Sequence, residues 1–176
     1  MVFAIAGRRI DAPVAARPRF PLRNIDLVRQ RVRGLFESRK PAAIVTSAAC
    51  GADLIVLEQA QLLGIECRVI LPFDPARFRV TSVADRPGNW GLLYDRLIPN
   101  AKLLTLSSEL DETAAYRAVT YRILSEAQAL AQDLNQDAMA VMIWDGQSRG
   151  NDDLTAAFGD EARQRGMEVL SLSTLG

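Results

Sequence analysis

The sequence of 176 residues contains no histidine and only two cysteines, Cys50 and Cys67. The absence of histidine excludes Ser-His and Cys-His catalysis and removes the commonest metal ligand. Two cysteines far apart in the sequence leave no second pair for a metal box, so we expect both thiols to be reduced. We therefore expect neither a bound metal nor a cofactor.

Long apolar runs and an excess of one charge are also missing. The longest apolar stretches, 69–73 and 138–144, fall far short of the roughly 20 residues that a membrane span needs. Residues 2–6 are apolar, but the arginines follow them instead of preceding them as in a secretory signal, so we expect a cytoplasmic protein without a membrane partner. Acidic and basic residues balance at 21 each, which disfavours nucleic acid as a partner.

Short runs rich in valine and isoleucine alternate with longer amphipathic segments along the whole chain. This alternation predicts an α/β fold, with a parallel sheet and helices on its faces. The chain length and a hydrophobic content of 49% fit a single domain over residues 1–176. The sequence predicts about six strands, at residues 2–6, 42–46, 66–71, 102–106, 138–144 and 168–172. It predicts helices at residues 21–38, 51–63, 88–97, 112–134 and 152–164.

Residues 47–53 form a turn of mostly small side chains between a predicted buried strand and a predicted helix. The first amides of a helix lack partners within it and bind anions, and small side chains let a ligand approach the backbone. We therefore predict a phosphate site made by Ser47, Ala48, Cys50 and Gly51. Asp53 either caps the helix amides or contacts the sugar or base of the ligand. The turn lacks the lysine of a P-loop and the glycine spacing of a dinucleotide fingerprint.

Three further strand ends are expected at the same edge of the sheet, where open α/β sheets bind small molecules. Guanidinium groups match phosphate oxygens, so the arginines after the first strand either contact the ligand or form surface salt bridges. The polar loop after the fifth strand either completes a clamp around the ligand or merely caps its helix. The candidate ligand-binding residues at these ends are Gly7, Arg8, Arg9, Pro72, Phe73, Asp145, Gly146, Gly150 and Asn151.

These segments together resemble the SLOG superfamily of Rossmann-like nucleotide-binding domains, which is related to LOG-type phosphoribohydrolases and to DprA. The resemblance rests on residues 7–11, the turn 47–53, residues 71–73, and residues 144–146 followed by Gly150. It implies a three-layer Rossmann-like domain that senses a nucleotide or a nucleotide-derived messenger. LOG-type enzymes carry a Pro-Gly-Gly-x-Gly-Thr-x-x-Glu segment that is missing here, so the resemblance favours binding over hydrolysis.

Two alternatives to a nucleotide sensor remain at this stage. The chain could hydrolyse a nucleotide, as a phosphoribohydrolase does, with Asp11, Asp53, Glu112 or Asp145 as the acid or base. It could instead be an interaction module, because the alanine-rich stripe of residues 112–134 would allow close packing against a second copy or another partner. The same stripe is explained by packing within the chain.

Overall fold

The computed structural model describes residues 1–106 and 111–176. Its centre is a six-stranded sheet with the strand order β4-β3-β2-β1-β5-β6, and every pairing in it is parallel. The strands are β1 (Val2–Gly7), β2 (Ala43–Thr46), β3 (Glu66–Leu71), β4 (Lys102–Thr105), β5 (Ala138–Trp144) and β6 (Glu168–Ser173). The predicted α/β class is confirmed, and each strand lies within one residue of its predicted bounds.

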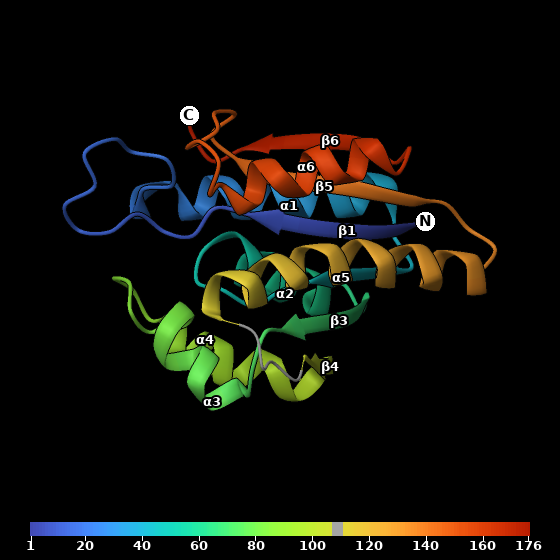
Figure 1. Ribbon diagram of the computed structural model, residues 1–176, viewed down its shortest axis with the longest axis horizontal. Helices are drawn as coiled ribbons and strands as arrows, with labels where there is room; N and C mark the ends of the chain where they lie inside the picture. The colour runs from blue at the N-terminus through green and yellow to red at the C-terminus, as the bar shows by residue number, and fades with distance from the viewer. Residues whose placement is uncertain (107–110) are drawn as a thin grey trace.

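Helices cover both faces of this sheet, which makes three layers (Figure 1). The helices are α1 (Ile25–Arg39), α2 (Ala52–Leu62), α3 (Pro75–Phe78), α4 (Trp90–Leu97), α5 (Glu112–Asp133) and α6 (Leu154–Gln164). Helices α1, α2 and α4 pack with Phe3 and Ile44 on one face. Helices α5 and α6 pack with Val2 and Ala4 on the other, because successive side chains of a strand point to opposite faces.

Four helices begin later than the sequence predicts: α1 by four residues, after the 3-10 turn Leu22–Asn24, α2 by one, and α4 and α6 by two each. The chain reaches α4 through Gly88, whose φ of +116° is incompatible with a right-handed helix. Asp153 precedes α6 as its N-cap, and its carboxylate accepts hydrogen bonds from the amides of Thr155 and Ala156. An N-cap residue lies outside the helical conformation, so the helix proper starts after it.

The sequence did not predict the helical structure between β3 and α4. There α3 is followed by a π-helical segment, Arg79–Val83. Each piece is too short to show a helical apolar period, and the surrounding residues are rich in arginine and proline. Pro75 nevertheless occupies the first turn of α3, and the Asp74 carboxylate caps it by accepting from the Arg77 amide at 2.9 Å. Both are ordinary helix-start signals.

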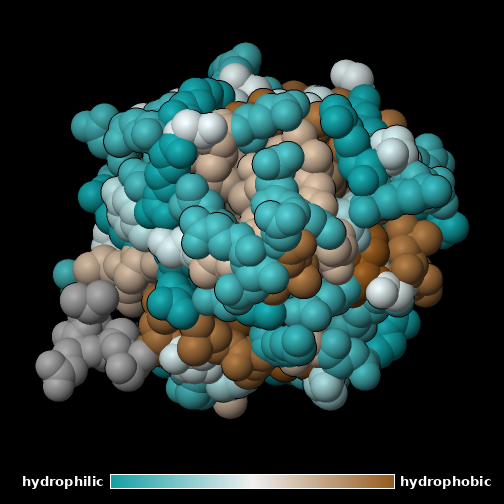
Figure 2. Space-filling model, turned by 90° about the vertical axis from the view of Figure 1, so that its right-hand side faces the viewer, coloured by the Kyte–Doolittle hydropathy of each residue, from teal (hydrophilic) through white to brown (hydrophobic). Residues whose placement is uncertain are grey.

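The strand order reverses at β1, because β2 lies on one side of it and β5 on the other. All six strands point the same way, so their carboxyl ends share the edge at the left of Figure 1. Figure 2 shows the molecule from the right-hand side of Figure 1, opposite the carboxyl ends of the strands. On this side hydrophilic groups interrupt the apolar patches. No helix among the described residues is long and apolar enough to cross a bilayer.

Candidate functional site

A cavity of about 600 Å³ lies at the edge of the sheet where β1 and β2 end. Its volume falls within the range of roughly 300–1,000 Å³ that small-molecule sites occupy. The walls come from the end of β1 and the loop after it, the turn before α2, the helical segment between β3 and α4, and the starts of α5 and α6. The charged residues that line it are Arg8, Arg9, Asp11, Arg17, Arg19, Asp53, Arg86, Glu112 and Arg149.

Glycine allows the chain after β1 to approach the turn before α2. Gly51 has a φ of +102°, and a Cβ there would lie 2.7 Å from both the Arg8 carbonyl oxygen and the Ile10 nitrogen. Arg9 and Gly51 form an isolated antiparallel bridge at this contact. Gly51 is therefore required by the approach of two backbone segments, and it does not itself line the cavity.

Several amides of the predicted phosphate turn already have acceptors within the protein. The Ala49 amide donates to the Asp53 carboxylate at 3.2 Å, the Cys50 amide to the Ser82 carbonyl at 3.0 Å, and the Ala52 amide to the Arg8 carbonyl at 3.0 Å. These bonds hold the turn against β1 and the π-helical segment. The turn thus offers a ligand fewer main-chain donors than its sequence suggests.

Asp53 is 7% exposed and lines the cavity from the first turn of α2. Burial raises its pKa to about 7, because an ionised carboxylate loses hydration there, and the Ala49 amide and the charge of Arg9 offset only part of that loss. The cavity wall therefore contains a buried carboxyl whose raised pKa is close to neutral pH. A carboxyl of this kind can accept hydrogen bonds from a ligand or transfer a proton.

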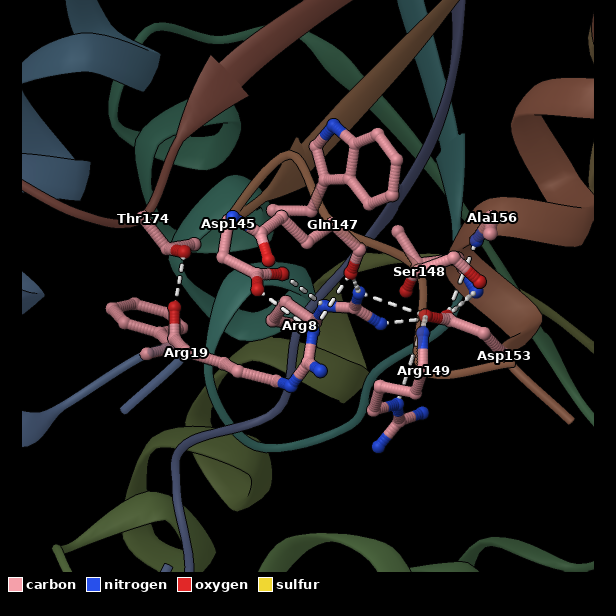
Figure 3. A network of polar contacts seen from close by, with 12 residues as sticks. Arg8, Arg19, Asp145, Gln147, Ser148, Arg149, Asp153, Ala156 and Thr174 are labelled. Atoms are coloured by element: carbon pink, nitrogen blue, oxygen red, sulfur yellow. Dashed lines mark hydrogen bonds and ion pairs between the residues drawn. The ribbon is translucent and has the colours of Figure 1, made fainter. Parts of the chain in front are cut away.

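Arg8 does not project freely into the cavity, although it forms part of the wall. Its guanidinium donates to Asp145 Oδ1 from Nε at 2.8 Å, to Asp153 Oδ1 from Nη1 at 2.6 Å, and to the Gln147 carbonyl from Nη2 at 2.6 Å (Figure 3). The side chain is 3% exposed, and its Cζ lies 5.5 Å from the centre of the Trp144 ring. Arg8 thus fixes the loop after β5 against the end of β1.

The same network reaches the start of α6 through Asp153. Burial of this carboxyl opposes its ionisation, but hydrogen bonds from Arg8 and from the amides of Arg149 and Ala156 outweigh burial and lower the pKa of Asp153 to about 2. The amino end of α6 is therefore occupied by a carboxylate of the protein itself, which is the capping role considered for this loop in the sequence.

Asp11 has a similar internal role in the loop after β1. Its carboxylate accepts hydrogen bonds from the amides of Arg19 and Phe20 at 3.0 to 3.2 Å. The Asp11 amide in turn donates to the Phe20 carbonyl. These bonds join the two ends of the loop, so Arg19 lies at the cavity. There its Nη1 donates to Asp145 Oδ2 at 2.7 Å.

The structure brings together only part of the predicted ligand-binding set. Gly7, Arg8, Arg9, Ser47 and Asp53 line the cavity. The predicted residues that do not line it are Ala48, Cys50, Gly51, Pro72, Phe73, Asp145, Gly146, Gly150 and Asn151. Some of these support the wall from behind, as Asp145 does through Arg8.

Cys50 is completely buried, and burial raises the pKa of its thiol despite the nearby Arg9 side chain. A thiol that resists ionisation is a poor nucleophile. Cys50 therefore acts as a small packing residue in the turn. Among the described residues, no three cysteine, aspartate or glutamate side chains are grouped as a metal site would require.

The sequence interpretation missed the aromatic and hydroxyl side of the cavity. Phe78 and Ser82 line it from the segment between β3 and α4, and Tyr116 lines it from α5. The hydroxyl groups of Ser82 and Tyr116 are hydrogen bonded, and the rings of Phe78 and Tyr116 lie 6.4 Å apart. No motif in the sequence marks these residues.

Comparisons with known proteins add a likeness of fold. No family model matches the sequence, and no curated protein matches it either. A matching solved structure is the X-ray structure of DNA processing protein A (DprA) from Streptococcus pneumoniae, with 15% sequence identity and a TM-score of 0.46. The match covers 96% of this chain, which spans 57% of the length of that chain. A likeness of this size concerns the fold and assigns no activity.

The expectation that disfavoured nucleic acid as a partner is wrong as an exclusion, because the structure matched is that of a DNA processing protein. The expectation rested on the balance of 21 acidic and 21 basic residues. A net charge averages over the whole surface, whereas a partner meets only the local charge. Here six arginines line one cavity, against three carboxyl residues.

Proposed function

We propose that this chain binds a nucleotide or a nucleotide-derived ligand in the cavity at the ends of β1 and β2, and acts as a sensor or regulatory module. The observation that carries the proposal is the composition of the cavity wall. Guanidinium groups, a buried carboxyl and aromatic rings share one space of about 600 Å³. Phosphate, sugar and base need these three kinds of partner.

The arginines suit the phosphate, because a guanidinium presents several donors in a planar fork. Asp53 and Ser47 suit the hydroxyl groups of a sugar, since a carboxylate accepts hydrogen bonds and a serine hydroxyl both donates and accepts. Tyr116, which is only partly buried, suits the face of a base, and the buried Phe78 ring packs beside it. In this proposal arginine side chains make most of the contacts with the phosphate, and the main-chain amides of the turn before α2 make fewer.

We also propose that the chain belongs to the SLOG superfamily and works in the cytoplasm. Membership of the SLOG superfamily would give the chain a role in nucleotide signalling, with the turn before α2 as part of the phosphate-binding loop. Cys50 and Cys67 are both free thiols, as a reducing compartment such as the cytoplasm would keep them.

Thermal denaturation in the presence of nucleotides tests the proposal. A ligand present at about 100 times its Kd adds about 2.7 kcal/mol to the free energy of unfolding, and for a chain of this size 1 kcal/mol raises Tm by about 2–4 °C. We expect AMP, NAD or ADP-ribose at millimolar concentration to raise Tm by on the order of 5 °C or more. If none of these compounds moves Tm, the proposal fails.

A pair of serine variants locates the binding site. Ser47→Leu places a bulky side chain in the cavity wall and should remove the ligand-induced rise in Tm. Ser125→Leu makes the same change on an exposed surface of α5 outside the cavity and should leave the rise intact. A rise that survives Ser47→Leu would place the ligand elsewhere.

Asp53 supports a second candidate function, hydrolysis of a nucleotide at its N-glycosidic or phosphate bond. Its pKa, raised to about 7 by burial, is suited to an acid or base near neutral pH. Of the other candidate carboxyls, Asp11 and Asp145 are engaged with amides and arginines, whereas Glu112 lines the cavity and has no ion pair among the described residues. Free base or phosphate released from a nucleoside monophosphate, and lost in Asp53→Asn, would establish the enzyme.

A further inference from the structure

Two separate groups of arginine and aspartate side chains contribute to the cavity wall, and each contains one more arginine than aspartate. The first group, here the β5-side cluster, consists of Arg8, Arg19, Arg149, Asp145 and Asp153. The second, the β3-side cluster, consists of Arg9, Arg86 and Asp85. All five of these arginines line the cavity.

In the β5-side cluster both aspartates are already saturated. Asp145 bonds Arg8 and Arg19, and Asp153 bonds Arg8 through both of its oxygens. Arg149 lies farther away, with its Nε 3.7 Å from Asp153 Oδ2, and about half of its side chain is exposed. Burial and the charges of Arg8 and Arg19 lower the pKa of Arg149, against the opposing effect of Asp153. Arg149 thus has the unbalanced positive charge of this cluster.

In the β3-side cluster one carboxylate serves two arginines. Asp85 accepts from Arg9 Nη2 through Oδ1, and its Oδ2 lies 3.7 Å from Arg86 Nε, which is beyond hydrogen-bond distance. The Nε atoms of Arg9 and Arg86 are both buried without a hydrogen-bond acceptor among the described residues, although the Cys50 thiol lies near Arg9. Buried donors of this kind normally have acceptors, so these two Nε atoms are suited to an oxygen-rich partner.

The two clusters lie on opposite sides of the end of β1. Arg8 and Arg9 are consecutive, yet Arg8 bonds the loop after β5 whereas Arg9 bonds the loop after β3. In the sheet β5 flanks β1 on one side, and β2 and then β3 lie on the other. A single phosphate on one cluster would leave the excess charge of the other uncompensated.

The carboxyl residues of the cavity wall do not supply these two negative charges. Asp11 is engaged by backbone amides, and neither Asp53 nor Glu112 forms an ion pair with an arginine within the described part of the chain. Burial raises the pKa of Asp53 to about 7, so its carboxyl is not fully ionised at neutral pH. The compensating groups are therefore expected from a ligand.

We infer that the ligand has two separated anionic groups, one held by Arg149 in the β5-side cluster and the other by Arg86 with Arg9 in the β3-side cluster. This inference rests on the proposed function and narrows it. The ligand class is a nucleotide derivative with two separate phosphate groups, such as a nucleoside bisphosphate or a cyclic dinucleotide. A mononucleotide occupies only one of the two clusters.

Calorimetric titration of three probes into the full chain tests the inference: AMP, adenosine 3′,5′-bisphosphate and cyclic di-AMP. Removing one charged partner of a phosphate commonly costs about tenfold in affinity. We expect at least one of the two-phosphate probes to bind about tenfold more tightly than AMP. Arg86→Gln and Arg149→Gln should each lower the affinity for that probe by about tenfold, whereas only one of them should weaken AMP.

Arg33→Gln is the matched control, because Arg33 is half exposed on α1, pairs with Glu37 and lies outside the cavity. It should leave all affinities unchanged, and the Tm of each ligand-free variant verifies its fold. Equal affinity for AMP and both two-phosphate probes would overturn the inference while leaving nucleotide binding intact. An unchanged two-phosphate affinity in either cavity variant would also overturn it. Failure of all three probes to bind would overturn the inference, and the proposed function would fall with it only if NAD and ADP-ribose also left Tm unchanged.

Discussion

Asp153 joins two structural tasks in one carboxylate, since it both binds Arg8 and caps α6. Asp153→Asn keeps an oxygen for the helix amides but removes the charge opposite Arg8. Taking one partner from a buried ion pair costs roughly 3–5 kcal/mol, and the surviving Asp145 contact favours the lower end, about 3 kcal/mol. Urea denaturation of the variant and its parent measures this difference in the free energy of unfolding.

The exposed pair of Asp160 with Arg163 provides the control for that experiment. Both side chains lie on the surface of α6, where an ion pair contributes roughly 0–1 kcal/mol. Asp160→Asn should therefore change the free energy of unfolding by less than about 0.5 kcal/mol. Equal effects of the two substitutions would show that the Arg8 network is solvated and contributes little.

Cys50 and Cys67 should both be unreactive in the folded protein. Both thiols are buried, and burial raises the pKa of Cys50 and brings that of Cys67 to about 12. Because the thiolate is the nucleophile, we expect iodoacetamide to modify both cysteines quickly in urea and only slowly in buffer at neutral pH. Peptide mass spectrometry identifies the site. Rapid native modification that Cys50→Ser abolishes would contradict the burial of the turn.

At the scale of elements, the contact between the end of β1 and the turn before α2 depends on Gly51. Gly51→Ala places a Cβ against two backbone atoms, at a φ of +102° that side chains rarely adopt. We expect it to lower the free energy of unfolding by on the order of 2 kcal/mol or more. Because β1 and the turn form the cavity wall, ligand binding should weaken as well.

Gly34→Ala in α1 makes the same chemical change in a permissive place. A Cβ there meets no atom within 4 Å, and the residue is exposed within a helix. Alanine is preferred to glycine inside helices by roughly 0.5–1 kcal/mol, so this variant should be slightly more stable than its parent. Thermal or urea denaturation of the two variants side by side measures the contrast. Destabilisation of similar size in both would refute the role given to Gly51.

The strands and the longer helices were predictable from the sequence, and the short helical pieces between β3 and α4 were not. Strand β5 was placed without error because it is a continuous buried apolar run, and α5 to within one residue because its buried positions repeat at helical spacing. The π-helical segment Arg79–Val83 is five residues long and is held by tertiary contacts such as the bond between Ser82 and Tyr116. Such contacts join residues far apart in sequence and leave no local pattern.

The candidate site was predictable to a similar extent. Gly7, Arg9 and Ser47 were found because they follow strands, and strand ends share one edge of a parallel sheet. The fate of Arg8 was not predictable, since its partners Asp145 and Asp153 come more than 130 residues later. Which of two adjacent arginines forms ion pairs within the protein depends on tertiary packing, and the spacing of residues in the sequence does not predict it.

At the scale of the whole molecule, two carboxyl groups give stability opposite dependences on pH. Asp153 has a pKa of about 2 when folded and 3.8 as its ordinary value, so its contribution is present above pH 3.8 and is lost as the pH falls toward 2. Asp53 has a folded pKa of about 7, so the folded protein keeps a proton that the unfolded chain releases above pH 3.8. Stability therefore falls as the pH rises from 3.8 to 7.

Asp53→Asn should remove the fall in stability between pH 3.8 and 7. At about 1.4 kcal/mol per pH unit, the parent loses up to about 4 kcal/mol between pH 3.8 and 7, or on the order of 10 °C in Tm. The sequence has no histidine, so no other side chain has an ordinary pKa near neutrality and the loss can be assigned to Asp53. Differential scanning calorimetry from about pH 4 to about pH 8 should show a falling Tm in the parent and in the exposed control Asp26→Asn, but a nearly level Tm in Asp53→Asn. A parallel fall in all three proteins would mean that the carboxyl in the cavity wall is ionised throughout, and that it meets a ligand as an anion.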